Sequence, residues 1–404
     1  MINIAVLGYG TVGSGVVEVI RTNKEQIGRR AGDEIRVKYV LDLREFPGDP
    51  VQDVLVHDFD TIAGDPEVDI VVEVMGGFEP AHTFAKRALE AGKSVCTSNK
   101  AMVAKFGAEL LEIAREKNVN FMFEASCGGG IPIIRALNGS LTADVIDQVA
   151  GILNGTTNYM LYRMRVEGSD FGTALKEAQE KGYAEADPTA DVDGHDARRK
   201  IAILSSIAYG GYMDAEEVYT EGIRDITPED MLYAEQMGMR IKLLAVSRQM
   251  PDGVCAALVA PFLVHAENPL FAVNDVFNAV FVHGNMLGDA MFYGSGAGKL
   301  PTASAVVADV IEEAQHLHEH IPCNWGEEKL ELQDPQEVDS LFFVRVTGKT
   351  REEIEAAFGK GCEFVSCPSL SGETGVITPR MTHREYYAAA EKIGGVISMI
   401  RIKD

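Results

Sequence analysis

The N-terminal stretch constrains the fold more than any other part of this chain. An apolar run over residues 2–7 precedes the sequence GYGTVG, and apolar residues at helical spacing follow it through Ile20. A strand, a turn with GxGxxG spacing and a helix in this order predict a dinucleotide-binding unit, in which glycines let the backbone approach a pyrophosphate at the helix start. The residues expected to contact the dinucleotide are Gly8, Tyr9, Gly10, Thr11, Val12 and Gly13.

The end of the second expected strand bears on the choice of dinucleotide. This strand, residues 35–41, is followed by Asp42 and Arg44. An acid at this point accepts hydrogen bonds from the adenosine ribose, whereas a nearby arginine favours the 2′-phosphate of NADP. Because both are present, the sequence leaves NAD and NADP open, and Arg44 is a candidate cofactor-binding residue.

Further strand-like runs alternate with helical patterns as far as residue 123. Polar residues stand where these runs end, namely Thr97, Asn99, Lys100 and Glu124. Strands that alternate with helices predict a doubly wound sheet, and the carboxyl ends of parallel strands line its ligand crevice. We therefore expect these four side chains to lie at the crevice.

The length of 404 residues predicts two or three domains rather than one. After residue 340 the order of strands and helices is βαββαβ, which is the ferredoxin-like arrangement. We predict an α/β protein with a Rossmann-type nucleotide-binding domain over residues 1–133, which a helix at about 301–320 completes. An α+β substrate-binding and dimerisation domain is expected over 134–300. A linker over 324–339 and a ferredoxin-like tail over 340–404 follow.

Composition excludes several classes of partner. The formal net charge of −24 argues against nucleic acid and against an anionic membrane surface. No apolar run approaches the roughly 20 residues that span a bilayer, and no targeting segment precedes the first strand. The six cysteines show no CxxC spacing, which favours free thiols in the cytoplasm and not a structural zinc site. The net charge does not bear on small ligands, which local groups hold, and we expect a small-molecule substrate.

Two glycine-rich loops have several possible roles. In the first, residues 124–132, backbone carbonyls beside Glu124 could hold a hard cation. Cys127 could instead be a nucleophile near a helix start, or the loop could be a purely structural turn. The second loop, residues 294–302, contains Gly298 and precedes a helix that we expect to return to the nucleotide domain.

Residues 181–204 concentrate acidic side chains ahead of basic ones. Asp196 and Lys200 are four residues apart with the acid first, which is the favourable order for an ion pair on one helix face. Such a segment is compatible with a solvated acidic surface. The crevice that the two glycine-rich loops imply favours a substrate site instead.

Six motifs occur in one order in this chain: GYGTVG, TSNK at 97–100, EASCGGGIPII at 124–134, GILNGTTNYML at 151–161, the acidic stretch and GSGAGKLPTASAVV at 294–307. With them the chain resembles homoserine dehydrogenase from residue 2 to about residue 318, and its tail resembles an ACT regulatory domain. The resemblance implies NAD(P)-dependent interconversion of L-homoserine and L-aspartate 4-semialdehyde in threonine, methionine and isoleucine biosynthesis. It also implies a homo-oligomer, dimer or tetramer, and an amino-acid effector at the tail.

The resemblance further implies roles for individual residues. Lys200 occupies the position of the proton-donating lysine, and Lys100 that of a lysine between cofactor and substrate. Asp196, one turn before Lys200, would orient it, and the turn from Asn154 to Thr157 would supply donors to the substrate carboxylate. The remaining implied positions are Glu185, Asp191 and Asp196 for the substrate amino group, Thr97 and Gly298 for the cofactor, and Glu124, Cys127, Gly129 and Ile131 for a monovalent cation, Na⁺ or K⁺.

Two other functions remain open from the sequence. An acylating semialdehyde dehydrogenase would use Cys127 to attack the aldehyde, with hydride leaving from a thiohemiacetal. A catalytically inactive, nucleotide-sensing regulator with an ACT module is the second alternative. Replacement of Cys127 separates the first from the homoserine reaction, and an absence of homoserine-dependent NAD(P) reduction would favour the second.

Overall fold

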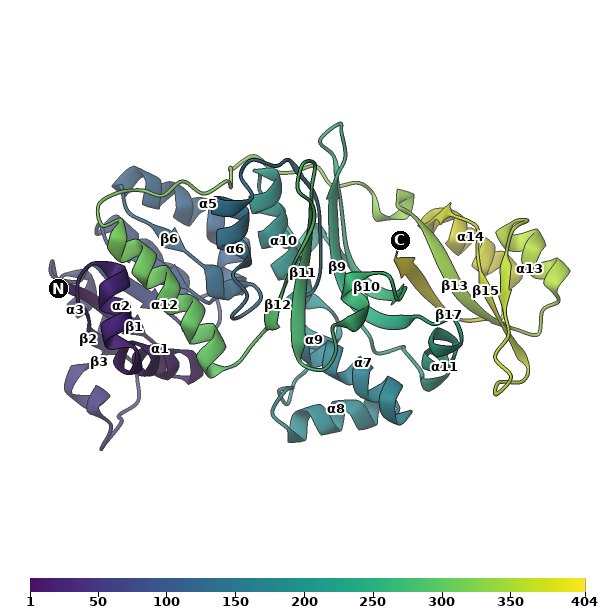
Figure 1. Ribbon diagram of the computed structural model, residues 1–404, viewed down its shortest axis with the longest axis horizontal. Helices are drawn as coiled ribbons and strands as arrows, with labels where there is room; N and C mark the ends of the chain where they lie inside the picture. Colours follow the sequence, from purple (N-terminus) through teal and green to yellow (C-terminus); the bar gives the residue numbers. More distant parts are fainter. Residues whose placement is uncertain (404) are drawn as a thin grey trace. The chain divides into compact units, whose positions relative to one another are not determined.

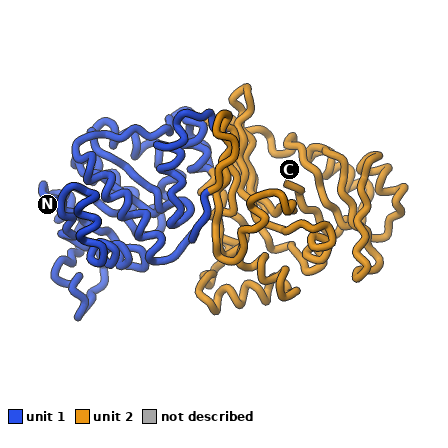
Figure 2. Tube along the Cα trace, in the orientation of Figure 1, with its two compact units in different colours: residues 1–146, 202–215, 292–329 blue, residues 147–201, 216–291, 330–404 orange. Residues whose placement is uncertain are grey.

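The computed structural model describes residues 1–403, which form two compact units (Figures 1 and 2). The chain passes between the units inside helix α10 (His195–Tyr209) and strand β12 (Gly288–Ser295). The three expected domains are thus distributed over two units, and the C-terminal tail belongs to the same unit as most of the expected substrate domain. Unit 1 comprises residues 1–146, 202–215 and 292–329, and unit 2 comprises residues 147–201, 216–291 and those from 330 onwards.

Unit 1 contains a parallel sheet of six strands in the order β3-β2-β1-β4-β5-β6. The order reverses at β1, which pairs with β2 on one side and β4 on the other. Open α/β sheets bind ligands outside the carboxyl ends of their strands at such a point. The sheet confirms the nucleotide-binding domain that the N-terminal motif predicted. Its strands are β1 (Ile2–Leu7), β2 (Ile35–Leu41), β3 (Leu55–Val56), β4 (Ile70–Glu73), β5 (Ser94–Thr97) and β6 (Phe121–Met122).

Helix α12 (Lys299–Gln315), which comes late in the chain, packs against α1 (Thr11–Thr22) in unit 1. A Cβ atom at Gly15 would lie 2.9 Å from the carbonyl oxygen of Lys299, so the two helices meet almost backbone to backbone. Across residues 1–403, no helix combines the length and the hydrophobicity needed to cross a membrane. The other helices of unit 1 are α2 (Lys24–Ala31), α3 (Phe59–Ala63), α4 (Ala81–Glu90), α5 (Lys100–Lys117) and α6 (Ile133–Arg135).

Unit 2 is built on a long mixed sheet, in the order β12-β11-β7-β9-β10-β17-β13-β15-β14, with short β8 (Tyr219–Thr220) joined to β10. Strands β9 and β10 pair antiparallel along their full length. The central strands are β7 (Ile146–Ile152), β9 (Arg240–Gln249), β10 (Cys255–Val264) and β11 (Phe277–Gly284), and the helices are α7 (Gly155–Glu167), α8 (Phe171–Glu180), α9 (Thr189–Val192), α10 and α11 (Pro228–Gln236).

The C-terminal module, residues 339–403, has the predicted βαββαβ order. Both of its helices start with a reciprocal capping box, Thr350 with Glu353 and Thr382 with Glu385. Its last strand pairs in parallel with β10, so the module continues the sheet of unit 2. The module comprises β13 (Asp339–Thr347), α13 (Arg351–Phe358), β14 (Glu363–Val365), β15 (Glu373–Ile377), short β16 (Met381–Thr382), α14 (His383–Ile393) and β17 (Val396–Lys403).

The stretch 324–339, expected as a linker, is held by backbone hydrogen bonds. In unit 1 the N–H of Tyr212 donates to the carbonyl oxygen of Glu328 at 2.7 Å. In unit 2 the N–H of Cys255 donates to Glu331, and the N–H of Gln333 donates back to Cys255, both at 2.8 Å. These bonds pair polar backbone groups of the stretch within each unit.

Candidate active site

The predicted dinucleotide loop forms the turn from β1 to α1. Gly8 has a φ of +94°, a conformation that favours glycine, and Gly10 caps α1. A Cβ atom at Gly13 would lie 1.9 Å from the carbonyl oxygen of Gly8, so a side chain at this position is sterically excluded. Thr11 and Val12 form the first turn, whose N–H groups and helix dipole attract a phosphate.

Asp42 and Arg44, the two residues that left the dinucleotide open, contact each other after β2. Arg44 Nη2 lies 2.8 Å from Asp42 Oδ2 and also donates to the carbonyl oxygen of Tyr9 at 3.1 Å, while the Tyr9 N–H donates to Asp42 Oδ2 at 2.8 Å. The Arg44 guanidinium holds the pKa of Asp42 well below its usual range. A cavity of about 420 Å³ opens here, lined among others by Gly8, Asp42, Arg44, His57 and Phe84.

Glu73 is a buried acid at the crevice that the sequence reasoning missed. It ends β4, has no exposed surface and accepts hydrogen bonds from the Thr97 hydroxyl at 2.5 Å and the Met75 N–H at 2.7 Å. Burial raises the pKa of Glu73 to about 7. The signal in the sequence was an acid that closes the apolar run 70–72 of a buried parallel strand, where a charge is unusual.

Glu73→Gln is expected to change how stability depends on pH. Because burial raises the pKa of Glu73 from 4.5 to about 7, the folded state binds this proton more tightly than the unfolded state. Stability that is present below pH 4.5 is therefore lost as the pH rises to about 7. The wild type loses about 3 kcal/mol of stability in this way. Glutamine does not titrate, so the variant should not show this loss.

Urea unfolding of both proteins at about pH 5 and about pH 8 measures this effect. Between these two pH values, the free energy of unfolding of the wild type should fall by more than that of the Gln variant. An identical difference at both pH values would contradict the assignment of the titration to Glu73.

Lys100 is the first residue of α5, at the same edge of the sheet as Glu73 and Thr97. The preceding Asn99 caps the helix by accepting the Met102 N–H, and its side-chain amide donates to the carbonyl oxygen of Gly77 at 2.6 Å. The Thr97 hydroxyl accepts the Asn99 N–H at 2.9 Å. The structure thus brings Thr97, Asn99 and Lys100 together at the strand ends, as predicted.

The two glycine-rich loops lie against each other in unit 1. A Cβ atom at Gly129 would lie 2.6 Å from the carbonyl carbon of Gly296, and the N–H of Gly130 donates to the carbonyl oxygen of Ser295 at 3.1 Å. Gly298, which has a φ of +120°, caps α12 immediately afterwards. The contact explains why glycines recur in both loops.

Glu124 serves the start of helix α6. Its two carboxylate oxygens accept the N–H groups of Ile134 and Arg135 at 2.9 and 2.7 Å, and burial raises the pKa of Glu124. Its own N–H donates to Asp309 of α12 at 2.9 Å. Within residues 1–403, no group of three or more His, Cys, Asp and Glu side chains is arranged to hold a metal. A cation in this loop would therefore depend on backbone carbonyls.

Cys127 does not have the surroundings expected of a nucleophile. It is fully buried, and its sulfur lies 3.9 Å from the Ser126 hydroxyl. Helix α6 starts only at Ile133, so the helix start that was expected to activate the thiol is not adjacent in the chain. The geometry favours a structural role for this side chain.

In unit 2, Lys200 and Asp196 form the ion pair that their spacing predicted. Lys200 Nζ lies 2.7 Å from Asp196 Oδ2 and also donates to the carbonyl oxygen of Leu153 at 2.7 Å. The two side chains are only 9 and 3% exposed. The segment is therefore not a solvated acidic surface at this point. Helix α10 holds an ammonium group in place between a carboxylate and a carbonyl.

Asn154 joins three of the predicted substrate residues. Its amide donates to Asp196 Oδ2 at 2.9 Å and to Asp191 Oδ1 at 2.7 Å. As the cap of α7, its Oδ1 accepts the N–H and the hydroxyl of Thr157 at 2.9 and 3.0 Å. The sequence did not predict this amide link, because residue 154 is far in the chain from both acids.

Three acids of the stretch stand outside this network, one of them Asp187, which accepts the Thr189 N–H at 3.1 Å. The side chain of Glu185 is exposed in the loop between α8 and α9, where its carbonyl oxygen accepts the Gln179 amide at 3.0 Å. Asp193 forms an ion pair with Arg224. Position in the chain alone did not distinguish these acids from Asp191 and Asp196.

Comparisons with known proteins find matches to a single family. The model of the family "Homoserine dehydrogenase, NAD binding domain" matches residues 8–124, and that of "Homoserine dehydrogenase" matches residues 132–311. The homoserine dehydrogenase of Neisseria gonorrhoeae is 42% identical over 367 residues, covering 86% of this chain and 82% of the relative. That of Bacillus subtilis is 39% identical over 390 residues, covering 95% and 89%.

Two solved structures have a similar fold. The homoserine dehydrogenase from Thiobacillus denitrificans matches with a TM-score of 0.90 and 37% identity, covering all of this chain and 98% of that one. A hyperthermophilic archaeal homoserine dehydrogenase in complex with NADPH matches with a TM-score of 0.66 and 30% identity, covering 77% of this chain and 97% of that one.

Proposed function

Because the chain belongs to the homoserine dehydrogenase family, we propose that Lys200 donates and accepts the proton in its reaction. The protein is an NAD(P)-dependent oxidoreductase that interconverts L-homoserine and L-aspartate 4-semialdehyde. The observation that carries the role of Lys200 is its burial between Asp196 Oδ2 and the Leu153 carbonyl, each at 2.7 Å. These contacts fix the direction of the ammonium group.

The bound nicotinamide supplies hydride to the aldehyde carbon in one direction and accepts it in the other. When hydride reaches that carbon, negative charge develops on the substrate oxygen. The Lys200 ammonium stabilises this charge and donates a proton to the oxygen, and general acid catalysis of this kind contributes about 10²–10⁴-fold. Asp196 holds the ammonium group in place through its contact at 2.7 Å.

Substrate recognition in this proposal uses the network around Asn154. Asp191 and Asp196 supply carboxylates for the substrate ammonium group, and Glu185 can join them from its exposed loop. The start of α7, which includes Thr157, presents N–H groups and the positive end of a helix dipole to the substrate carboxylate. Opposite charges are thus provided for both ends of an amino acid.

For the cofactor, we propose residues of unit 1 and a preference for NADP. The loop from Gly8 to Gly13 holds the pyrophosphate, and Thr97, Lys100 and Gly298 line the strand ends. Arg44, whose side chain is 62% exposed beside the cavity, is positioned for a 2′-phosphate. The archaeal relative bound to NADPH is consistent with this choice.

Arg44→Ala is expected to lower kcat/KM for NADP by about 10–100-fold, because a hydrogen bond to a charged group contributes roughly 1.5–3 kcal/mol. The value for NAD should change little, since an acid at the end of this strand, here Asp42, is the residue type that binds the ribose hydroxyls of NAD. Initial rates with both cofactors measure this. Arg36→Ala, an exposed arginine near the other end of β2, is the matched control. Equal losses for NAD and NADP would contradict the preference.

A monovalent cation fits the first glycine-rich loop as an oxygen-liganded ion. We propose that the backbone carbonyls of Cys127, Gly129 and Ile131 hold it, and that Glu124 contributes negative charge. The Glu124 carboxylate already accepts two N–H groups at 2.9 and 2.7 Å, so its oxygens are the weaker ligands. A cation here would stiffen the contact between the two glycine-rich loops.

The C-terminal module is proposed to be an ACT-type regulatory domain with an amino-acid effector. Its strand order β17-β13-β15-β14 and two helices support the ferredoxin-like arrangement. We also propose a homo-oligomer, because β12 is an edge strand of the sheet and carries exposed apolar residues. Light scattering in solution measures its size. These exposed residues, including the β11–β12 turn, are Met286, Leu287, Met291 and Tyr293.

One set of assays tests the function. Initial rates are measured with L-homoserine and NAD or NADP, in Na⁺, K⁺ or a bulky organic cation, with and without threonine. Reduction of the cofactor that depends on homoserine is expected, and its absence would favour the inactive nucleotide-sensing regulator. Cys127→Ser should retain most activity. Near-abolition of activity by this change would favour the acylating dehydrogenase.

A further inference from the structure

The last strand of the chain brings a buried arginine into the sheet of unit 2. Strand β17 pairs in parallel with β10, and Arg401 is opposite Phe262. The Arg401 side chain has no exposed surface, although a guanidinium is always charged. A buried charge is tolerated only where it is paired and hydrogen-bonded, so the partners of Arg401 indicate what it holds.

The guanidinium of Arg401 is bonded to two side chains. Its Nη1 and Nη2 donate to the two carboxylate oxygens of Glu221 at 2.6 and 2.8 Å, and its Nε donates to His383 Nε2 at 3.0 Å. Burial, followed by the nearby guanidinium, lowers the pKa of His383 to about 4, so the imidazole is neutral and can accept this bond. The Tyr219 hydroxyl donates to the same carboxylate. Glu221 is therefore fixed in position.

The residues after this carboxylate lie against the segment that precedes α10. A Cβ atom at Gly222 would lie 2.2 Å from the carbonyl oxygen of Val192, so the two backbones touch. The Ile223 N–H donates to that carbonyl oxygen at 2.8 Å, and Arg224 forms an ion pair with Asp193. Three successive residues thus hold the end of α9.

This end of α9 leads directly into the helix with the acid–base pair. Gly194 follows Asp193, and its carbonyl oxygen accepts the Arg198 N–H at 2.9 Å, which starts the backbone ladder of α10. Asp196 and Lys200 lie in the first two turns of this helix. A shift at residues 192–194 would therefore displace both side chains.

We propose that Arg401 is a positioning residue for the reaction, which holds the start of α10 in place through Glu221. This inference rests on the proposed role of Lys200. It gives the C-terminal module a function in the reaction itself, independent of any effector. Without Arg401, the Glu221 carboxylate loses its cation and would move toward water, and the backbone contact with Val192 would move with it.

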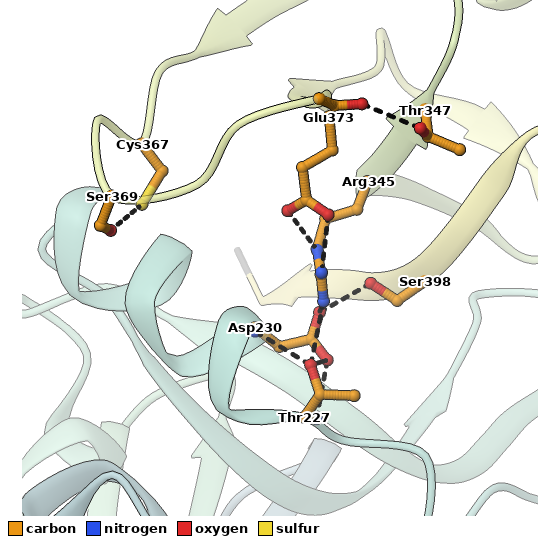
Figure 3. A network of polar contacts seen from close by, with 9 residues as sticks. Thr227, Asp230, Arg345, Thr347, Cys367, Ser369, Glu373 and Ser398 are labelled. Carbon is orange, nitrogen blue, oxygen red and sulfur yellow. Dashed lines mark hydrogen bonds and ion pairs between the residues drawn. The ribbon is translucent and has the colours of Figure 1, made fainter.

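Arg345 offers a matched comparison on the neighbouring strand β13 (Figure 3). It is also buried, with 4% of its side chain exposed, and its guanidinium binds Asp230 at 2.9 Å and Glu373 at 2.8 Å. Asp230 accepts a further hydrogen bond from Ser398 at 2.7 Å. These partners lie on α11, β15 and β17, and within residues 1–403 none of them forms a hydrogen bond or ion pair with residues 192–194. Both arginines thus anchor the module, but only Arg401 binds Glu221, the residue directly before the segment 222–224 that contacts the end of α9.

The test compares Arg401→Met with Arg345→Met in the full-length protein. Arg401→Met is expected to lower kcat with homoserine at least about tenfold, while KM for the cofactor stays within about twofold. Arg345→Met should lower the thermal midpoint by a similar amount and leave kcat within about twofold. Arg401→Lys, which keeps the charge without the bidentate bond, should restore part of kcat.

Three outcomes overturn the inference. They are an unchanged kcat in Arg401→Met, an equal loss of kcat in Arg345→Met, and a rise in KM for the cofactor that accounts for the whole loss. If Arg401→Met does not fold, Glu221→Gln replaces it with the same expectations. Lys200→Ala distinguishes a failure of the proposed role of Lys200 from a failure of the proposed role of Arg401. Full activity in Lys200→Ala would contradict the role of Lys200, whatever Arg401→Met shows.

Discussion

Lys200→Ala is expected to lower kcat by about 10²–10⁴-fold, the usual contribution of a general acid. The variant lacks the ammonium group that neutralises the developing charge on the substrate oxygen. Cofactor affinity should stay within about twofold, since the residues proposed for the cofactor belong to unit 1. Steady-state rates in both directions and fluorescence titration with NADPH measure the two effects.

The change also leaves the buried Asp196 carboxylate without its cation, so the thermal midpoint must be measured alongside. Lys176→Ala provides the control, because Lys176 lies on α8 and its side chain is 78% exposed. That variant should have wild-type kcat. A Lys200→Ala protein that folds and keeps near wild-type kcat would disprove the proton-transfer role.

Gly13→Ala is expected to have the largest effect on cofactor binding. The new methyl group would lie 1.9 Å from the Gly8 carbonyl oxygen, so α1 or the loop must move. Overpacking of this kind costs about 1–3 kcal/mol, and the displaced helix start no longer presents its N–H groups to the pyrophosphate. We expect the dissociation constant of NADPH to rise at least about tenfold and the thermal midpoint of the apo protein to fall.

Gly10→Ala separates these two effects within the same motif. No atom lies within 4 Å of a Cβ at Gly10, and the residue has an ordinary φ of −85°. This variant should keep the thermal midpoint of the apo protein, and any loss of affinity would then report contact with the cofactor alone. A Gly13→Ala protein as stable as Gly10→Ala would show that the loop absorbs the methyl group.

Features that depend on neighbours in the chain were predictable. The strand, glycine turn and helix of residues 2–20 follow one another directly, and so do Asp42 and Arg44 after β2. The ion pair of Asp196 and Lys200 depends only on the four-residue repeat of a helix, and it is present at 2.7 Å. The βαββαβ order of the tail was predictable for the same reason, because alternating patterns mark each element.

Features that depend on long-range contacts were not predictable. Asn154 reaches Asp191 and Asp196 only because the start of α7 meets that of α10. The sequence pattern made Cys127 a candidate nucleophile, but packing buries it completely. Glu73 shows the same limit, since its bond to Thr97 requires β4 and β5 to pair in register.

The sequence by itself determined the nucleotide-binding fold, the elements of the tail and the motifs that identify the family, since these depend on local geometry and on residue order. The tertiary structure alone decided which acids of residues 181–204 gather around Lys200 and which remain in solvent. It also decided that Arg401 and Glu221, 180 residues apart, form an ion pair. The physical reason is that burial and hydrogen-bond partners are set when distant segments pack, and a pattern read along the chain does not contain those distances.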